Sequence, residues 1–215
     1  MLIHPPRQAR SEASLGRLVQ AAEEVLREKS FDEAGLAEIA ARAGVTTGVF
    51  YGRFAGKDAL LRHLEERVYE AQAVFVGAQV ERLATDTSAP LSSLVLDLLT
   101  GATAFYREHR GTLRALDLRA RSDRALRARM DEANRRTLGA LAPIVEARRG
   151  EIRHPGPSQA FPFAVLLAGN TLREAVLFDT PWLAEAGWSD QKLARELTRA
   201  FLAYLGVEET APSPG

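Results

Sequence analysis

Apolar residues recur at helical spacing along almost all of this 215-residue chain, and that pattern restricts the folds it can adopt. Positions three and four apart share one face of an α-helix, whereas a strand places every second residue on one face. Two of the stripes consist of Leu91, Leu94, Val95, Leu98, Leu99, Ala102 and Phe105, and of Leu193, Leu197, Phe201 and Leu205. No stretch alternates for long in the manner of a half-buried strand. The sequence therefore predicts an all-α protein.

Helix breaks divide the predicted helices into a short-helix region and a long-helix region. The first 55 or so residues contain three short segments, and the segments that follow are longer. We expect an N-terminal arm and domain at 1–56, a larger helical domain at 57–207, and a flexible tail at 208–215 without apolar periodicity. The expected N-caps of three later helices are Ser88, Ser122 and Ser189.

Charge, cysteine content and hydropathy exclude several classes of protein. The 28 basic and 28 acidic residues balance, so a nucleic-acid partner would require a local arrangement of charge. The absence of cysteine excludes disulfides, thiolate metal sites and a cysteine nucleophile. The start MLIHPPRQAR lacks the apolar core of a signal peptide, and the most apolar run, 160–169, is shorter than the roughly 20 residues that span a bilayer. We therefore expect a cytoplasmic protein with no membrane partner.

Motifs of enzymes occur only in fragments. GRFAGKD has one spacer too few for a phosphate-binding loop, and Asp58 stands where that loop needs Ser or Thr. Ser189 and Lys192 match the S-x-x-K spacing of acyl-enzymes, but their companion motifs are missing. The four histidines are His4, His63, His109 and His154, and none has metal-ligand spacing with another. We therefore expect that the protein is not an enzyme and binds no metal or cofactor. The arginine run from 107 to 129 is interpreted as a solvated helix face, and the alternative is a binding site for an anionic ligand.

The stretch AGVTTGVFYGRFAGKDAL, residues 43–60, has the spacing of a helix-turn-helix. A short helix is predicted over 36–43, and Gly44 follows where a chain leaving a helix needs a left-handed residue. Thr46 is placed to cap a second helix that runs from Thr47 to about Arg53.

The outward face of this second predicted helix suits a phosphate backbone. Every charged residue from Ile39 to Lys57 is basic, and the other exposed residues are small or carry hydroxyl groups. Phosphates need cations, hydroxyls and helix N-termini without carboxylates nearby, and small residues allow close approach to base edges. The candidate DNA-binding residues are Arg42, Thr46, Thr47, Gly48, Tyr51, Gly52, Arg53 and Lys57. The alternative is a glycine-rich turn with a solvated basic edge.

The segment FDEAGLAEIAARAGVTTGVFYGRFAGKDALL resembles the DNA-binding domain of the tetracycline-repressor (TetR) family of bacterial transcription regulators. The family pattern I-A-x-x-A-G-V-[ST]-x-G-x-x-Y-x-x-F-x-x-K-x-x-L is matched in register from Ile39 to Leu60. The resemblance implies that Thr46, Tyr51 and Lys57 hold phosphates, and that Thr47 and its exposed neighbours face the bases.

The segment departs from the family pattern at positions that affect base reading. Arg53 replaces a common His or Tyr, and Gly48 with Gly52 leaves few side chains on the outer face. We predict that Thr47, Arg53 and Val49, the last against a thymine methyl, read the bases, and that a basic arm containing Arg7 and Arg10 adds contacts.

The resemblance also implies a homodimer with a small-molecule pocket in the C-terminal domain. The candidate dimer surfaces are the segments 160–177 and 193–205. The candidate ligand-lining residues are Phe105, Leu116, Met130, Phe163, Asn170 and Phe178. Asn170 is polar within an apolar helix, and a buried amide needs a partner, so it would meet a ligand or fix the register of the dimer.

These observations predict a ligand-responsive repressor. It would bind a palindromic operator in double-stranded DNA as a homodimer, and an unidentified small organic effector would release it. The alternative is a helical ligand-binding or protein-interaction module with a non-functional helix-turn-helix.

Overall fold

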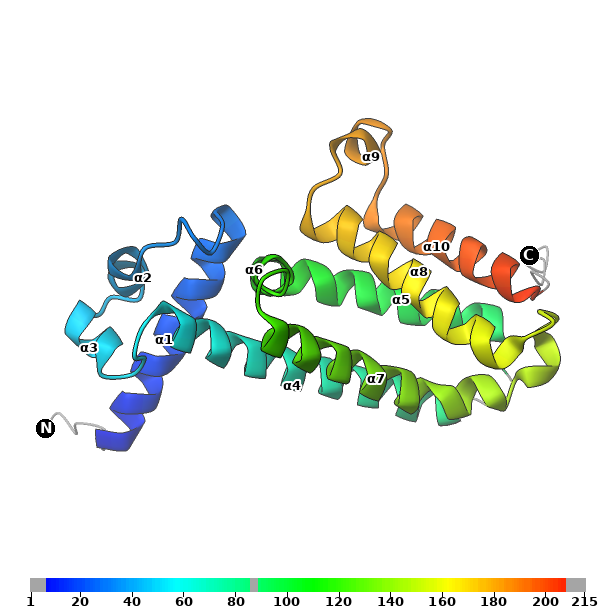
Figure 1. Ribbon diagram of the computed structural model, residues 1–215, viewed down its shortest axis with the longest axis horizontal. Coiled ribbons are helices and arrows are strands. Elements are labelled where there is room, and N and C mark those ends of the chain that lie inside the picture. Colours follow the sequence, from blue (N-terminus) through cyan, green and yellow to red (C-terminus); the bar gives the residue numbers. More distant parts are fainter. Residues whose placement is uncertain (1–6, 86–88, 208–215) are drawn as a thin grey trace, which may run out of the picture. The chain divides into compact units, whose positions relative to one another are not determined.

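A computed structural model describes residues 7–85 and 89–207, and within these ranges the chain forms helices and no strand (Figure 1). The predicted all-α class is therefore confirmed. The α-helices are α1 Arg7–Glu28, α2 Leu36–Arg42, α3 Thr47–Tyr51, α4 Lys57–Thr85, α5 Leu91–Glu108, α6 Arg110–Arg119, α7 Arg124–Glu146, α8 Pro157–Leu177, α9 Pro181–Glu185 and α10 Asp190–Leu205, with a 3₁₀ turn at Arg149–Glu151. Ser88 and the tail 208–215 lie outside the described residues.

The chain forms two compact units, and their limits differ from the boundaries expected from sequence. The head unit contains residues up to Glu70 together with His109–Arg127. The body unit contains Ala71–Glu108 and the residues from Ala128 onward. Helices α4 and α7 each contribute to both units, and α6 belongs to the head unit although it lies beyond the expected boundary at 56.

Helix α6 joins the head unit because its first turns pack against the C-terminal end of α1. A Cβ at Gly111 would lie 2.7 Å from the carbonyl carbon of Leu26 and 2.8 Å from the amide nitrogen of Arg27. The guanidinium of Arg114 donates hydrogen bonds to the carbonyl oxygens of Leu26 and Lys29, at 2.9 and 3.0 Å. Leu26 lies in the last turn of α1 and Lys29 directly follows the helix, so Arg114 donates to carbonyl groups at its C-terminal end.

Alanine at Gly111 is expected to destabilise the protein by about 1–3 kcal/mol, because the new methyl group must push the α1 backbone away. This loss opposes the gain of up to about 1 kcal/mol that alanine gives over glycine in a helix. Denaturant unfolding monitored by circular dichroism measures the change. The matched control is Gly16→Ala in α1, where no atom lies within 4 Å of the new Cβ, and it is expected to be neutral or stabilising. Equal stabilisation by both variants would contradict the close α6–α1 contact.

The body unit is built around α5, α8 and α10, which pack on one another. Ion pairing joins the end of α5 to the start of α10, where the Arg107 guanidinium contacts the Asp190 carboxylate at 2.8 and 3.0 Å. Between α4 and α7, the Gln72 amide donates to the Thr137 hydroxyl at 3.1 Å. Long-range polar contacts of this kind fix the ends and faces of otherwise apolar helices.

Helix starts agree with the sequence prediction at one of the two described capping sites. The Ser189 hydroxyl accepts a hydrogen bond from the Lys192 amide at 3.2 Å, which confirms Ser189 as the N-cap of α10. Ahead of α7, the expected cap Ser122 is wrong: its hydroxyl donates to the Arg119 carbonyl. The carboxylate of Asp123 instead accepts from the Leu126 amide at 2.9 Å, because it stands one residue closer to the helix.

Candidate nucleic-acid interface

A tight turn connects α2 to α3 in the head unit. Gly44 adopts a left-handed conformation with φ +65°, and the Val45 amide bonds to the Ala40 carbonyl at 3.0 Å. Thr46 is extended, with φ −78° and ψ 157°, and its hydroxyl accepts from the Val49 amide at 3.3 Å. The predicted turn glycine and N-cap threonine are therefore both confirmed.

Helix α3 is held to the head unit by one aromatic residue on its inner face. Phe50 is fully buried, and its ring centre lies 5.4 Å from that of Phe54. Ala40 on α2 is also buried, so no large side chain separates α2 from α3. Because only the Phe50 side of α3 packs against the head unit, the rest of its surface is open to a partner.

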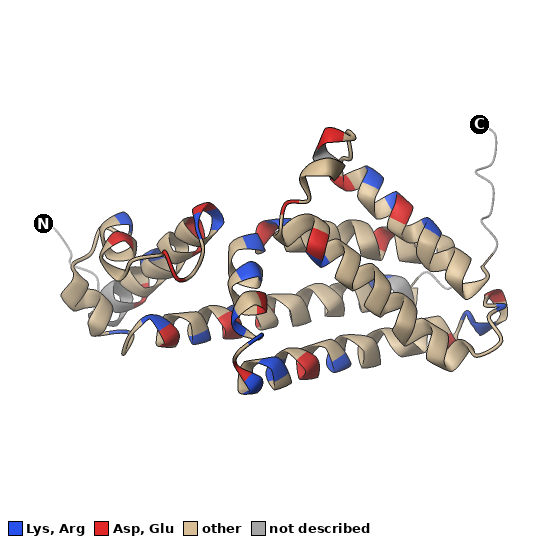
Figure 2. Ribbon diagram, turned by 45° about the horizontal axis from the view of Figure 1, so that its top comes forward, with Lys and Arg blue, Asp and Glu red and all other residues tan. Residues whose placement is uncertain are grey.

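Helix α3 itself contains no charged residue, as its colour in Figure 2 shows, and Arg53 follows two residues after its end. The exposed residues of the outer face are Thr47, Gly48, Val49, Tyr51, Gly52 and Arg53. Val49 and Tyr51 expose 39% and 59% of their surface, which is unusual for residues of their size. A Cβ at Gly48 or Gly52 would come no closer than 3.4 Å to another atom. These two glycines are therefore not required by packing, and they leave room for a close partner.

Arg42 lies at the end of α2, and acidic residues offset its charge. Its guanidinium forms a two-point contact with the Glu28 carboxylate at 2.6 and 2.8 Å and lies 3.8 Å from Glu38. The hydrogen bond from Arg42 lowers the pKa of Glu28, which keeps that carboxylate ionised. Residues 39–57 contain no acidic residue in the sequence. In the folded chain, however, α1 and α2 place carboxylates beside Arg42.

Lys57 starts α4 and is tied to the loop between α1 and α2. Its ammonium donates to the Asp32 carbonyl at 3.0 Å and lies 4.7 Å from the centre of the Phe31 ring. An ammonium has three donors, so this bond is compatible with a phosphate contact. The structural role of Lys57 was not visible in the sequence because its partners lie 25 and 26 residues away.

Two further arginines position the helix-turn-helix, and sequence reasoning missed both. Arg17 of α1 donates to the Ala43 carbonyl at 3.1 Å, which satisfies the C-terminal end of α2. Arg119 of α6 lies 3.3 Å from the Asp58 carboxylate in the first turn of α4. Neither residue belongs to a short motif, so only the folded chain reveals these contacts.

Residues 18–64 match the model of bacterial regulatory proteins of the tetR family. This range contains the capped helix α3, the left-handed turn at Gly44 and the start of α4. The chain belongs to the tetR family of bacterial regulatory proteins. Its helix-turn-helix is accordingly a DNA-binding one, and the protein is a tetR-family transcriptional regulator.

Solved structures share the fold of this tetR-family chain over most of its length. NalD, the secondary repressor of the MexAB-OprM multidrug efflux pump in Pseudomonas aeruginosa, has a TM-score of 0.65 at 20% identity, covering 94% of this chain and 99% of NalD. A tetR-family transcriptional regulator from Streptomyces coelicolor has a TM-score of 0.63 at 19% identity, covering 90% and 80%. FadR from Bacillus subtilis, in complex with stearoyl-CoA, has a TM-score of 0.62 at 19% identity, covering 88% and 98%. No curated protein matches the sequence.

The predicted ligand-lining residues of this tetR-family protein divide between the two units. Leu116 is buried in the head unit, whereas the other five belong to the body unit. Phe105 is buried and stacks on Phe75 with ring centres 5.6 Å apart, while Met130 and Phe178 are half-buried.

Two of the predicted ligand-lining residues lie outside the interior. Phe163 is 45% exposed, and Asn170 is also exposed, with its side-chain oxygen accepting from Arg173 at 2.7 Å. Both side chains belong to the outward face of α8 in the single chain, and their role in ligand binding stays a prediction. Within the described ranges, no group of three or more His, Asp or Glu residues is arranged to hold a metal ion.

Proposed function

We propose that this tetR-family regulator is a non-enzymatic repressor that binds a palindromic operator as a homodimer and is released by a small organic effector. The observation that carries the proposal is the exposed outer face of α3, which has no acidic residue and belongs to a helix capped by Thr46 and anchored by Phe50. The amide groups of Thr47 and Gly48 at its N-terminus can donate hydrogen bonds to a phosphate, and its small residues permit entry into a major groove.

The few exposed side chains of α3 divide into base-reading and phosphate-holding groups in this proposal. Thr47 and Arg53 can hydrogen-bond to base edges, and the exposed methyl groups of Val49 suit a thymine methyl. Thr46, Tyr51 and Lys57 hold phosphates, which position the protein without reading sequence. Arg42 is the weakest member of the predicted set, because Glu28 and Glu38 offset its charge. Arg7 and Arg10 start helix α1 rather than forming an extended arm, and their side chains lie outside the described part of the chain.

Alanine at Thr47 is expected to weaken binding to an operator by about 1–3 kcal/mol while leaving binding to random DNA nearly unchanged. Lys57→Ala is expected to weaken both DNAs alike and to reduce the salt dependence of binding by about one counterion. Gel shifts over a salt series, on an operator selected from random duplexes, measure both effects. Thermal unfolding of each variant shows whether the protein has lost stability. This separates the loss of a DNA contact from the loss of the hydrogen bond between Lys57 and the Asp32 carbonyl. Equal losses on the two DNAs for Thr47→Ala would contradict its base-reading role.

Failure of the protein to bind any duplex, even at low salt, would contradict the whole proposal. That outcome would favour the alternative of a helical ligand-binding or protein-interaction module. The test uses the wild-type protein in an operator-selection experiment. If the protein is correctly folded, a negative result can be interpreted without a variant.

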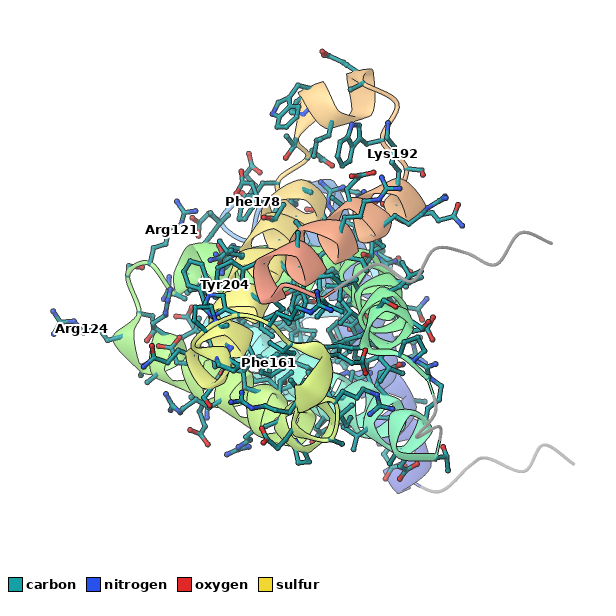
Figure 3. All side chains as sticks on the ribbon, turned by 90° about the vertical axis from the view of Figure 1, so that its right-hand side faces the viewer. Arg121, Arg124, Phe161, Phe178, Lys192 and Tyr204 are labelled. Atoms are coloured by element: carbon teal, nitrogen blue, oxygen red, sulfur yellow. The ribbon has the colours of Figure 1, made fainter. Side chains whose placement is uncertain are left out.

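The proposed dimer rests on the outward face of α8. Phe163, Leu166 and Leu167 expose 45%, 55% and 46% of their surface and lie at helical spacing on one side. The ring centre of Phe163 lies 5.2 Å from that of Tyr204, which Figure 3 labels on α10, so the two helices contribute neighbouring aromatic side chains. An apolar face of this kind requires a cover.

A second copy of the chain is the proposed cover for this face. Helix α8 is long and apolar enough to cross a membrane by length and composition, although a core helix of a soluble protein passes the same test. A two-fold dimer would also supply the second recognition helix that a palindromic operator needs. Asn170, exposed on the same face, then fixes dimer register rather than binding ligand.

The effector is proposed to bind within the body unit and to shift the dimer toward a state that no longer fits the operator. The fold is shared with a repressor of an efflux pump and with a regulator that was crystallised with stearoyl-CoA. Phe105 and its stacked partner Phe75 give the body unit an aromatic interior that suits an organic ligand. Density for a co-purified molecule in crystals of the protein would test this part of the proposal.

A further inference from the structure

The segment from Phe178 to Ser189, which contains α9, forms an arm between α8 and α10. Within the body unit, α9 stands apart from the ends of both helices (Figure 1). The arm has a defined conformation: the Trp188 amide bonds to the Leu183 carbonyl at 3.0 Å, and the Ala186 amide bonds to the Trp182 carbonyl at the same distance. This segment is called the α9 arm below.

The two tryptophans of the α9 arm have different surroundings. The ring of Trp188 is half-buried and lies under the Lys192 ammonium, which is 5.1 Å from the ring centre at the base of the arm (Figure 3). Trp182 is 65% exposed, the largest side chain on the described surface to be so open. An indole buries about 150–250 Å² when it is covered, and tryptophan is enriched among the residues that dominate interface energetics. An indole held in water on a structured arm therefore points to a binding partner.

The area of the proposed dimer face favours a second copy as that partner. Stable interfaces bury about 800 Å² on each side, and the three half-exposed apolar side chains of α8 supply only a fraction of this area. The α9 arm begins directly after α8, and Trp182 is the largest exposed apolar side chain available to add to this area.

The charge of the α9 arm disfavours other occupants. From Phe178 to Ser189 its charged residues are Asp179 and Glu185, both acidic. Anionic DNA and anionic lipid surfaces would be repelled by this segment. A protein surface is the remaining class, and the copy already required by the α8 face is the one within reach.

We propose that Trp182 of the α9 arm docks on the second copy of the chain and forms part of the dimer interface. The inference rests on the proposed homodimer but concerns a segment that the α8–α10 face does not include. Trp182 would be a hot-spot residue, while Trp188 would only brace the arm against Lys192.

Tryptophan emission tests this directly, because the chain contains only two tryptophans. In a Trp188→Phe variant, Trp182 is the single reporter. Its emission is expected to shift to shorter wavelength, and its acrylamide quenching to fall several-fold, as concentration rises through the dimerisation range set by sedimentation velocity. In the matched Trp182→Phe variant, Trp188 is expected to show no dependence on concentration.

The three contrary outcomes are distinguishable from one another. A dimer in which Trp182 stays as quenchable as free indole would overturn arm docking and leave the proposed dimer standing. A protein that sediments as a monomer at all concentrations would overturn the proposed dimer, and arm docking with it. Shielding of Trp182 at concentrations where the protein sediments as a monomer would show that the arm folds onto its own chain, which also overturns the inference.

Loss of the indole should also weaken the dimer. Trp182→Ala is expected to raise the dimer dissociation constant about 1,000-fold, because a hot-spot residue contributes about thirty-fold and a two-fold interface contains it twice. The matched control is Glu185→Ala on the same arm, which is expected to leave the constant unchanged. Equal dissociation constants for wild type and Trp182→Ala, with both proteins folded by circular dichroism, would overturn the inference.

Discussion

Phe50→Ala is expected to abolish DNA binding by destabilising the head unit. Phe50 is fully buried and is the inner anchor of α3, with ring contacts to Phe54 and Tyr51. Truncation of a buried phenylalanine costs about 3–5 kcal/mol, which is a large part of the roughly 5–15 kcal/mol that stabilises a typical domain. Helix α3 has five residues and cannot hold its conformation without that anchor.

Tyr51→Ala is the matched control, because Tyr51 neighbours Phe50 but is 59% exposed. Its effect on stability is expected to be at most about 1 kcal/mol, mainly from the lost edge contact with Phe50. DNA affinity should fall in both variants, but only Phe50→Ala should shift the denaturant midpoint strongly. A Phe50→Ala protein with wild-type unfolding and no DNA binding would contradict the anchoring role and make Phe50 a contact residue.

The helix-turn-helix could be predicted from sequence because its determinants are local. Gly44 permits the left-handed turn, Thr46 caps α3 from three residues away, and Phe50 with Phe54 follows helical spacing. Each of these effects depends on neighbours within a few positions, so the printed order of residues already contains the geometry.

Contacts between distant segments could not be predicted in the same way. Arg114 reaches α1 across more than 80 residues, and Arg17 reaches the end of α2 across 26. Gly111 gave no sign that it allows α6 to approach the α1 backbone, because a helical glycine looks the same whether its missing side chain faces solvent or another helix. The grouping of α6 with the head unit follows from these contacts alone.

The interior of the body unit was the least predictable part of the candidate sites. Helix α8 is apolar nearly all round, and such a pattern demands burial without saying which face meets the same chain and which meets another copy. The pattern thus does not reveal that Phe163 and Asn170 lie on the outward face of α8 in the single chain. Arg42 shows the same limitation for charge, since its partner Glu28 lies 14 residues earlier.

Leu166→Glu is expected to convert the proposed dimer into monomers. Leu166 is 55% exposed in the single chain, so the change should alter the stability of a monomer by no more than about 0.5 kcal/mol. Two-fold symmetry places the substitution in the interface twice. Each lost leucine removes about 1.5–3 kcal/mol of apolar burial, so the dimer dissociation constant should rise by more than about 100-fold even before the cost of desolvating the carboxylates. Sedimentation velocity measures the constant.

The same variant separates dimerisation from DNA recognition, because α3 lies in the head unit and α8 in the body unit. Leu166→Glu should retain a half-site affinity close to that of wild type and lose the extra affinity that a palindrome gives to a linked pair. Val74→Glu is the matched control: Val74 is 73% exposed on α4, outside the α8 face, and its replacement should leave both sedimentation and palindrome binding unchanged. If Leu166→Glu remained a dimer at low micromolar concentration, the α8 face would not be the interface, and the exposed apolar stripe would need another partner.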